Sequence, residues 1–403
     1  MTAIPGVAEE EREDPLVFLI AGEPSGDLLA ARLMAAMKAE SGNRLRFAGI
    51  GGEQMTAQGL KSLFPIHEFA VMGFVEVLPH LFKIIMRIRQ TVAIVKSLRP
   101  DVVITIDSPS FTLEVAQRLK GEGIPLVHYV APQVWAWKAG RAKRMARYLD
   151  LILALLPFEP PLFEKNGLKT RFVGHPAVEL AVSDEQRLAD RLPKTGEGPL
   201  LAVLPGSRKG EVRKLLPVFE ATVAVLAERH PGLRVVIPTV ETVEAEVRQR
   251  TASWTVPVEV VRGAEAKQKA FAEAQAALAA SGTVALELAV ASVPAVIAYR
   301  LSGIGAFLSA GLLTVPYVSL VNLIAERLVQ PELLQGNCTV EKLVEPLESL
   351  LSDPQARQTQ RSAYLEVVRA LTPAEGSPSR CAAREVLDLL SERRGKNPAP
   401  AAP

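Results

Sequence analysis

Residues 16–34 read LVFLIAGEPSGDLLAARLM, which is a short apolar run, a glycine-bearing turn and a helical stretch in succession. This order is typical of a parallel sheet with helices on both faces. The same alternation recurs at RFAGI, DVVITI, PLVHYV and LILALL, and a second series follows at LLAVL, RVVIP, VEVV, AALAA and AVIAY. Two such series predict an α/β protein made of two Rossmann-like, doubly wound domains that face a cleft, followed by C-terminal helices.

The domain boundaries follow from local composition. The segment SDEQRLADRLPKTGEGP separates the two series, is polar and contains Gly and Pro, so it predicts a linker. The expected order is a flexible tail (1–14), a first domain (15–182), the linker (183–199), a second domain (200–340), C-terminal helices (341–395) and a disordered tail (396–403).

Composition excludes several classes of protein. The 46 Lys and Arg residues nearly balance the 44 Asp and Glu residues, so the net charge of +2 provides no uniform field for a nucleic acid. Two cysteines are too few for a disulfide framework and are compatible with a reducing cytosol. The start, MTAIPGVAEEEREDP, is acidic where a signal peptide is basic, so we expect a cytoplasmic protein. The uncharged stretch 301–325 contains Gly, Ser, Pro and Asn, which favours buried loop and short helix over a membrane span.

Two strand-to-helix loops of the first domain carry carboxylates. In AGEPSGD, Glu23 and Asp27 would lie at the mouth of the cleft; the alternative is that they only complement the dipole of the following helix. In DVVITIDSPSF, Asp107 ends an apolar strand, where a carboxylate could take a proton from a substrate hydroxyl. Asp107 could equally cap the next helix.

Two loops of the second domain suit a diphosphate. In LLAVLPGSRKGEV, the residues Gly206, Ser207 and Arg208 place backbone N–H groups and a guanidinium at a helix start; the alternative is an ordinary turn with a surface arginine. In ALAASGTVALELAV, a carboxylate one turn inside the helix could accept hydrogen bonds from a ribose. The residues of this second loop are Ser281, Gly282, Thr283 and Glu287. The sequence has no cluster with metal-ligand spacing, so we expect no metal.

An apolar edge precedes the second long helix of the first domain, in the stretch GFVEVLPHLFKIIMRIR (73–89). Part of this helix has a core-facing pattern, and beyond Ile88 we expect burial. Apolar side chains that precede the helix lie outside its core-facing pattern, so part of this surface would stay uncovered, which predicts attachment to a membrane surface. The residues of this predicted edge are Phe74, Val75, Leu78, Leu81 and Phe82.

Taken in order, the motifs resemble the lipid A disaccharide synthase family of glycosyltransferases. They are AGEPSGD, GIGGEQM, VMGFVEVL, IDSPSF, YVAPQVWAWKAGR, LPFE, FVGHP, LPGSRKGEV, ASGTVALE and SLVNLIA. The resemblance covers roughly residues 16 to 345, and the conjunction is more specific than any single loop.

The resemblance implies the two-domain fold of GT-B glycosyltransferases, with the acceptor and the membrane on the first domain and the UDP-sugar on the second. It implies an inverting reaction in which UDP-2,3-diacylglucosamine and 2,3-diacylglucosamine 1-phosphate form a β-1,6-linked disaccharide 1-phosphate and UDP. The enzyme would need no cofactor and would associate peripherally with the inner membrane. Homodimers have a precedent in the family.

The resemblance also suggests roles for the loop residues. Asp107 would be the general base, with Glu23 and Asp27 as alternative bases or acceptor-positioning groups. Arg208 would stabilise the charge on departing UDP together with the small residues of both loops, Glu287 would hold the ribose, and Asn322 would lie near the nucleotide.

The chain departs from the family pattern at Ser110, where the family commonly has a second Asp. The uncharged stretch 301–325 also lacks basic residues for anionic lipid, a role that Lys138, Arg141, Lys143 and Arg144 could fill instead. Two other functions stay open at this point: a UDP-N-acetylglucosamine 2-epimerase on the same architecture, and a nucleotide-binding membrane adaptor without catalysis.

Overall fold

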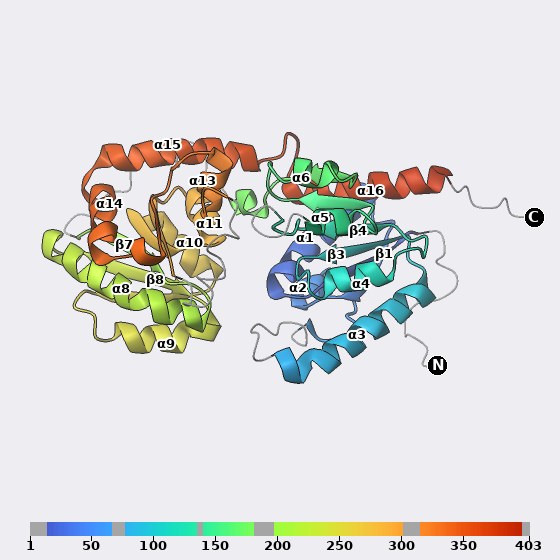
Figure 1. The fold of residues 1–403 in the computed structure, drawn as a ribbon, viewed down its shortest axis with the longest axis horizontal. Helices are drawn as coiled ribbons and strands as arrows, with labels where there is room; N and C mark the ends of the chain where they lie inside the picture. Colours follow the sequence, from blue (N-terminus) through green and yellow to red (C-terminus); the bar gives the residue numbers. More distant parts are fainter. Residues whose placement is uncertain (1–13, 67–76, 135–139, 181–196, 301–314, 397–403) are drawn as a thin grey trace, which may run out of the picture. The chain divides into compact units, whose positions relative to one another are not determined.

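The computed structural model describes residues 14–66, 77–134, 140–180, 197–300 and 315–396 (Figure 1). The chain forms two compact units: the first comprises residues 1–176 and 372–403, and the second residues 177–371. Each unit contains one six-stranded parallel sheet. The predicted class, two Rossmann-like α/β domains, is therefore confirmed.

The sheet of the first unit has the strand order β2-β1-β3-β4-β5-β6. Its strands are β1 (Leu16–Ala21), β2 (Arg46–Ile50), β3 (Val102–Ile106), β4 (Leu126–Tyr129), β5 (Leu151–Ala154) and β6 (Thr170–Phe172). The direction of strand succession reverses between β1 and β3. In open α/β sheets, ligands bind outside the carboxyl ends of the strands at such a reversal.

Alternation along β1 explains why helices cover both faces of this sheet. Val17 and Leu19 belong to one apolar cluster, which includes side chains of α1 (Pro24–Ser41) and α16 (Pro378–Lys396). Phe18 and Ile20 belong to a second cluster on the other face. That face is covered by α3 (Val77–Leu98), α4 (Thr112–Arg118), α5 (Gly140–Met145) and α6 (Pro160–Glu164). The short helix α2 (Glu53–Ala57) follows β2.

The sheet of the second unit has the order β12-β11-β10-β7-β8-β9, which reverses between β7 and β10. Its strands are β7 (Leu200–Leu204), β8 (Arg234–Thr239), β9 (Val258–Arg262), β10 (Ala276–Ala280), β11 (Ala295–Tyr299) and β12 (Glu332–Leu334). One apolar cluster joins the sheet to α8 (Lys209–Arg229), α9 (Glu241–Thr251) and α14 (Val340–Ser352). The other helices of this unit include α10 (Ala264–Glu273), α11 (Val284–Val290), α13 (Leu320–Ala325) and α15 (Pro354–Leu371).

The apolar runs quoted from the sequence all form strands. Strands β6 and β12, of three residues each, are not among those runs. The predicted C-terminal helical segment is divided between the two units. Helices α14 and α15 belong to the second unit, and α16 packs on α1 of the first, where Arg384 donates to Glu40 at 3.0 Å. The chain therefore returns to its first unit at the end.

Several predictions fall outside the described residues: the N-terminal tail, almost all of the linker, the C-terminal tail, and residues 301–314 of the uncharged stretch. Phe74 and Val75 of the predicted membrane edge also lie outside them, as do the side chains of Leu78, Leu81 and Phe82. Further along α3, Ile88 and Val95 are buried, which confirms the core-facing prediction there. Within the described part of the chain, no helix combines the length and the apolar character needed to cross a membrane.

Candidate active site

Asp107 is the first residue after β3, at the carboxyl end where the strand order of the first unit reverses. Asp107 and Ser108 both have positive φ, 49° and 44°, which residues other than glycine seldom adopt. The turn is held because the Asp107 N–H donates to the Tyr129 carbonyl at 3.0 Å and the Thr112 hydroxyl donates to the Asp107 carbonyl at 2.6 Å. Backbone strain of this kind concentrates at functional sites.

The Asp107 carboxylate does not cap the following helix. It accepts a hydrogen bond from the N–H of Ser108 at 2.8 Å, whereas α4 begins after Phe111, which makes no side-chain capping bond. The side chain is half-buried at the strand end. The capping alternative from the sequence is therefore not what the structure shows.

Glu23 lies at the same edge of the sheet as Asp107. Strands β1 and β3 are paired, with Ala21 opposite Ile106, so the loops that follow them are neighbours. Gly22 packs directly on Ser108, because a Cβ at position 22 would lie 2.7 Å from the Ser108 side chain. Glu23 is the half-buried residue that precedes α1. The structure thus places the loops that carry Glu23 and Asp107 next to one another.

Asp27 has a different role from the predicted one. Its side chain is 5% exposed and accepts hydrogen bonds from the N–H groups of Gly52 (2.7 Å), Gln54 (3.0 Å) and Met55 (3.1 Å). These are the amides at the start of α2, which have no partners within that helix. Asp27 therefore caps α2 from a distance in sequence, and we correct its assignment as an alternative base to a structural one.

In the second unit, the loop of Gly206, Ser207 and Arg208 follows β7 at the reversal of strand order. Its backbone N–H groups converge on an anion, but that anion is the carboxylate of Glu211. Glu211 accepts from the N–H of Ser207 at 3.2 Å and from that of Arg208 at 3.4 Å. Gly206 has a φ of 110°, and a Cβ there would lie 2.4 Å from a Glu211 oxygen.

The Arg208 guanidinium lies 3.5 Å from Glu211 and its side chain is 64% exposed. The predicted loop therefore does hold a negative charge by amides and a guanidinium. Glu211 was missed in the sequence analysis, because Arg208 at the N-cap offers no side-chain acceptor and the Ser/Thr-x-x-Glu pattern of a capping box is absent.

The loop of Ser281, Gly282 and Thr283 follows β10, the strand next to β7. Helix α11 begins directly after Thr283 and carries Glu287 in its first turn, as expected. Glu287 forms an ion pair with Lys267 at 2.8 Å, and each side chain is 37% exposed. Lys267 was not singled out from the sequence, because it lies 20 residues away on α10.

Asn322 is fully buried on α13, and its side chain is hydrogen-bonded within the protein. Its amide nitrogen donates to the Gln330 carbonyl (2.8 Å) and to Glu332 (2.7 Å), and its oxygen accepts from the N–H groups of Val329 and Gln330 (2.8 Å each). The Asn322 side chain thus orders the backbone of residues 329–330 and contacts Glu332 at the start of β12. Its place near a nucleotide stays a prediction.

Burial shifts the pKa values of two histidines in the first unit. It lowers the pKa of His128 to about 3, with a smaller effect of the Arg141 charge, and it lowers the pKa of His175 to about 4. His128 is fully buried and shares a 2.8 Å hydrogen bond with Thr105. Among the described residues, no group of three or more His, Cys, Asp and Glu side chains could hold a metal ion.

The family model described as lipid-A-disaccharide synthetase matches residues 17–386. The chain belongs to the lipid-A-disaccharide synthetase family. The lipid-A-disaccharide synthase of Paramagnetospirillum magneticum is 51% identical over 388 residues, covering 94% of this chain and 98% of the relative. That of Rhodospirillum centenum is 49% identical, covering 94% and 95%. This membership supports the glycosyltransferase interpretation over the epimerase alternative.

Solved structures of other proteins share the fold at low sequence identity. The Staphylococcus aureus MnaA–UDP structure has a TM-score of 0.61 at 13% identity, covering 94% of this chain and 97% of that one. Acinetobacter baumannii MurG has a TM-score of 0.54 at 16% identity, covering 94% and 99%. These likenesses support the two-domain fold of this lipid-A-disaccharide synthetase family member, and they do not identify its activity.

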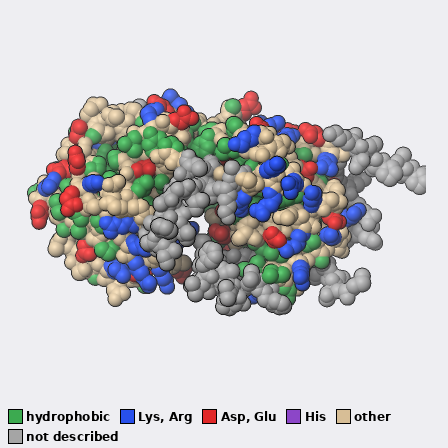
Figure 2. Space-filling model, in the orientation of Figure 1, with side chains coloured by type: hydrophobic (Ala, Val, Ile, Leu, Met, Phe, Trp, Pro, Cys, Tyr) green, Lys and Arg blue, Asp and Glu red, His purple; other side chains and the backbone are tan. Residues whose placement is uncertain are grey.

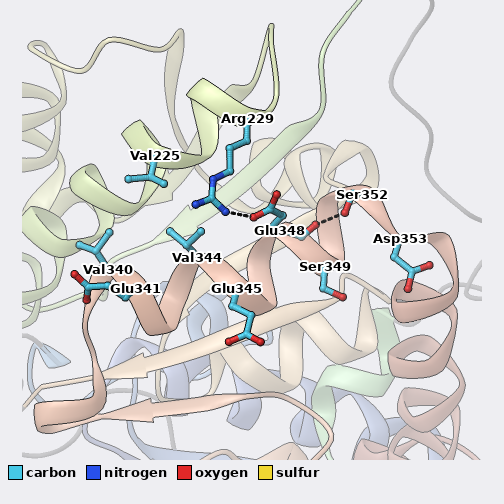
Figure 3. Close-up of a pocket in the computed structure, with 10 residues that line it drawn as sticks. All are labelled: Val225, Arg229, Val340, Glu341, Val344, Glu345, Glu348, Ser349, Ser352 and Asp353. Carbon is cyan, nitrogen blue, oxygen red and sulfur yellow. Dashed lines mark hydrogen bonds and ion pairs between the residues drawn. The ribbon is translucent and has the colours of Figure 1, made fainter.

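A groove of about 680 Å³ in the second unit lies between α8 and α14, away from the strand-end loops (Figure 3). Val225 and Arg229 form its α8 side, near the end of that helix remote from Arg208, and Arg229 is paired with Glu348. Acidic side chains, including Glu341 and Glu345, line the facing helix. A nucleoside diphosphate would be repelled from this groove, so we do not place the site of this family member there.

Proposed function

We propose that this chain transfers 2,3-diacylglucosamine from UDP to the 6-hydroxyl of 2,3-diacylglucosamine 1-phosphate. The observation that carries the proposal is the position of the predicted loops. In each unit they follow the two strands between which the order of the sheet reverses, where this fold class binds its ligands. Membership of the lipid-A-disaccharide synthetase family supports the choice of substrates.

Asp107 acts as the general base on the acceptor. Its carboxylate takes the proton of the 6-hydroxyl while that oxygen attacks the anomeric carbon of the donor. The bond from the anomeric carbon to the UDP oxygen breaks, its electron pair leaves with UDP, and the configuration inverts. Glu23, at the same edge of the sheet, positions the acceptor. The half-buried state of Asp107 and its strained turn support this assignment.

The second unit holds the departing UDP. Arg208 and the N–H groups of Ser207 and Arg208 receive the diphosphate, so they stabilise the charge that develops as the bond breaks. These are the donors that hold Glu211 here, and the diphosphate competes with that carboxylate for them. Residues 281–283 flank the diphosphate and Glu287 binds the ribose. The reaction proceeds without a metal.

We further propose that the first unit attaches to the inner membrane from the cytoplasmic side. The apolar residues Phe74, Val75, Leu78, Leu81 and Phe82 support this through the sequence pattern. The division into an acceptor-binding first domain, a linker at 183–199 and a UDP-binding second domain is part of the same proposal. A homodimer is proposed on the family precedent.

The deciding experiment incubates the purified protein with both acylated substrates in detergent and follows the products by mass spectrometry. We expect the disaccharide 1-phosphate and an equal amount of UDP. Epimerised UDP-sugar without disaccharide would support the epimerase, and UDP binding without any product would support the adaptor.

Asp107→Asn separates catalysis from binding. We expect kcat to fall by about 100-fold or more, as for loss of a general base, with UDP affinity retained. Glu122→Gln is the matched control, because Glu122 is a carboxylate of the same unit that pairs with Lys96. If Asp107→Asn retains activity as the control does, Asp107 is not the base.

A further inference from the structure

A small polar pocket of about 210 Å³ opens beside the Asp107 loop in the first unit. One wall is the turn after Asp107 and the helix α4, with Ser110, Glu114 and Gln117. The other wall is α5 and the turn that follows it, with Arg141, Arg144 and Tyr148. Every described part of this pocket belongs to one unit. The role suggested above for Arg141 and Arg144 is contact with anionic lipid, and the proposed reaction assigns none to this pocket.

Local packing explains why the two arginines face the pocket. Ala142 and Met145 are buried in the apolar cluster that also holds Leu113 of α4, which fixes α5 on the sheet beside α4. Arg141, Arg144 and Tyr148 are spaced by three and four residues, so they share one side of this helical segment. In Figure 2, Lys and Arg side chains gather over the part of this unit where α5 lies.

The pocket has a positive charge that the described residues do not balance. Neither Arg141 nor Arg144 forms an ion pair with any described side chain, whereas the acid on the opposite wall, Glu114, is paired with Arg118 at 2.8 Å. Tyr148 senses both guanidiniums: burial raises the pKa of its hydroxyl, and the charges of Arg144 and Arg141 partly oppose that shift. Two adjacent guanidiniums with a hydroxyl between polar walls are suited to a phosphate.

The pocket is also close in sequence and space to the proposed base. Ser110 lies on the rim, three residues after Asp107 and in the same turn before α4. A sugar phosphate held there by its phosphate would lie against the turn that follows Asp107. An acceptor with a phosphate at carbon 1 and its reacting hydroxyl at carbon 6 has this layout.

We propose that Arg141 and Arg144, with the hydroxyls of Ser110 and Tyr148, bind the phosphate monoester of the acceptor. This inference rests on the proposed function and adds the group that orients the acceptor. A bilayer phosphodiester is the other source of phosphate, and it is disfavoured because the site is a concavity between two helices. Exposed Lys143 and Arg147, which do not line the pocket, are better suited to a flat lipid surface.

The test compares two acceptors that differ only in the anomeric group: the 1-phosphate and the uncharged methyl glycoside. We expect wild-type kcat/KM to favour the phosphate by about 10-fold or more, as for hydrogen bonds to a charged group. In Arg141→Gln/Arg144→Gln this preference should vanish through a higher KM for the phosphorylated acceptor, with an unchanged KM for the UDP-sugar. Lysine at both positions should restore part of the preference.

The matched control is Lys143→Gln/Arg147→Gln, which removes the same charge from the same segment and should keep the preference. If the double variant does not fold, the same comparison of the two acceptors is made with Arg144→Gln alone. Arg144 is exposed, so this substitution should not prevent folding. Equal use of both acceptors by the wild type, or an unchanged preference in the pocket variant, overturns the inference while disaccharide synthesis still stands. No disaccharide from either acceptor overturns the proposed function itself.

A second arm tests the bilayer. Sedimentation with vesicles of phosphatidylglycerol should give equal binding for the wild type and the pocket variant. If the variant instead loses vesicle binding and loses activity equally toward both acceptors, the arginines bind the membrane and the inference is wrong.

Discussion

A Cβ at Gly22 would lie 2.7 Å from both the Cβ and the Oγ of Ser108. No ordinary side chain fits at that distance, so the two loops at the reversal of the first sheet touch only because residue 22 is glycine. Ser108 is itself held at positive φ next to Asp107. The contact therefore ties the AGEPSGD loop to the position of the proposed base.

Gly22→Ala should displace the Asp107 turn. We expect lower thermal stability and a lower kcat, because the methyl group must push Ser108 and its neighbour away from their present positions. Gly26→Ala is the control: its Cβ would meet its nearest neighbour at 3.5 Å, an ordinary contact. Adding Ser108→Gly to Gly22→Ala should restore both properties in part; no rescue would mean that the contact does not govern the turn.

Asp27→Ala should destabilise the protein, because three amides at the start of α2 lose their acceptor. We expect the free energy of unfolding in urea to fall by about 1–3 kcal/mol, the usual cost of buried unsatisfied groups. The kcat of the folded protein should change little. Glu53→Gln, on the first turn of the same helix, is the control. A large loss of kcat at unchanged stability would return Asp27 to the candidates for the base.

Arg208→Ala should weaken UDP binding measured by titration calorimetry. The expected rise in Kd is about 10- to 100-fold, because a charged hydrogen-bond donor to the diphosphate is lost. Arg213→Ala is matched to it: Arg213 is 61% exposed on α8, the helix that follows Arg208, and pairs with Glu246. A similar loss of UDP affinity in both variants would indicate a general effect of positive charge and not a UDP site at Arg208.

Glu211→Gln should act in the opposite direction. Glutamine can still accept the two loop hydrogen bonds, but it removes the negative charge that competes with a diphosphate. We expect the Kd for UDP to fall by about two- to fivefold, in proportion to one half-buried charge near a helix start. A rise in Kd would mean that Glu211 helps to shape the UDP site and does not compete for it.

The stability of the protein should fall as the pH is lowered. Burial lowers the pKa of His128 from 6.5 to about 3, so between these values the unfolded chain binds a proton that the folded protein does not. The contribution is complete above about pH 6.5 and decreases below it, by up to about 1.4 kcal/mol per pH unit. His175, with its pKa lowered to about 4, acts in the same direction.

Urea unfolding at several pH values checks this dependence. His128→Gln should reduce the slope of unfolding free energy against pH without abolishing it, because His175 remains. Thr105→Val removes the hydrogen-bond partner of His128 but keeps the imidazole, and should keep the slope. An equal slope in His128→Gln and the wild type would show that His128 is not protonated on unfolding in this range.

The alternation of apolar runs with helical stretches determined the fold class, because strand and helix periodicity is a local property of the chain. The loops were predictable for the same reason: Asp107 and Gly206 directly follow buried strands, so their place at carboxyl ends follows from the strands themselves. Glu211 is equally local, because it lies only three and four residues after the Arg208 and Ser207 N–H groups from which it accepts hydrogen bonds.

Only the tertiary structure decided which polar groups are free to act. Asp27 and Asn322 stand in promising motifs, but amides that arrive from residues 52–55 and 329–330 occupy their side chains. The pairing of α16 with α1 and the pocket between α4 and α5 likewise join segments far apart in the chain. A sequence pattern records periodicity along the chain, whereas hydrogen-bond partners and pocket walls depend on which distant segments the fold brings into contact.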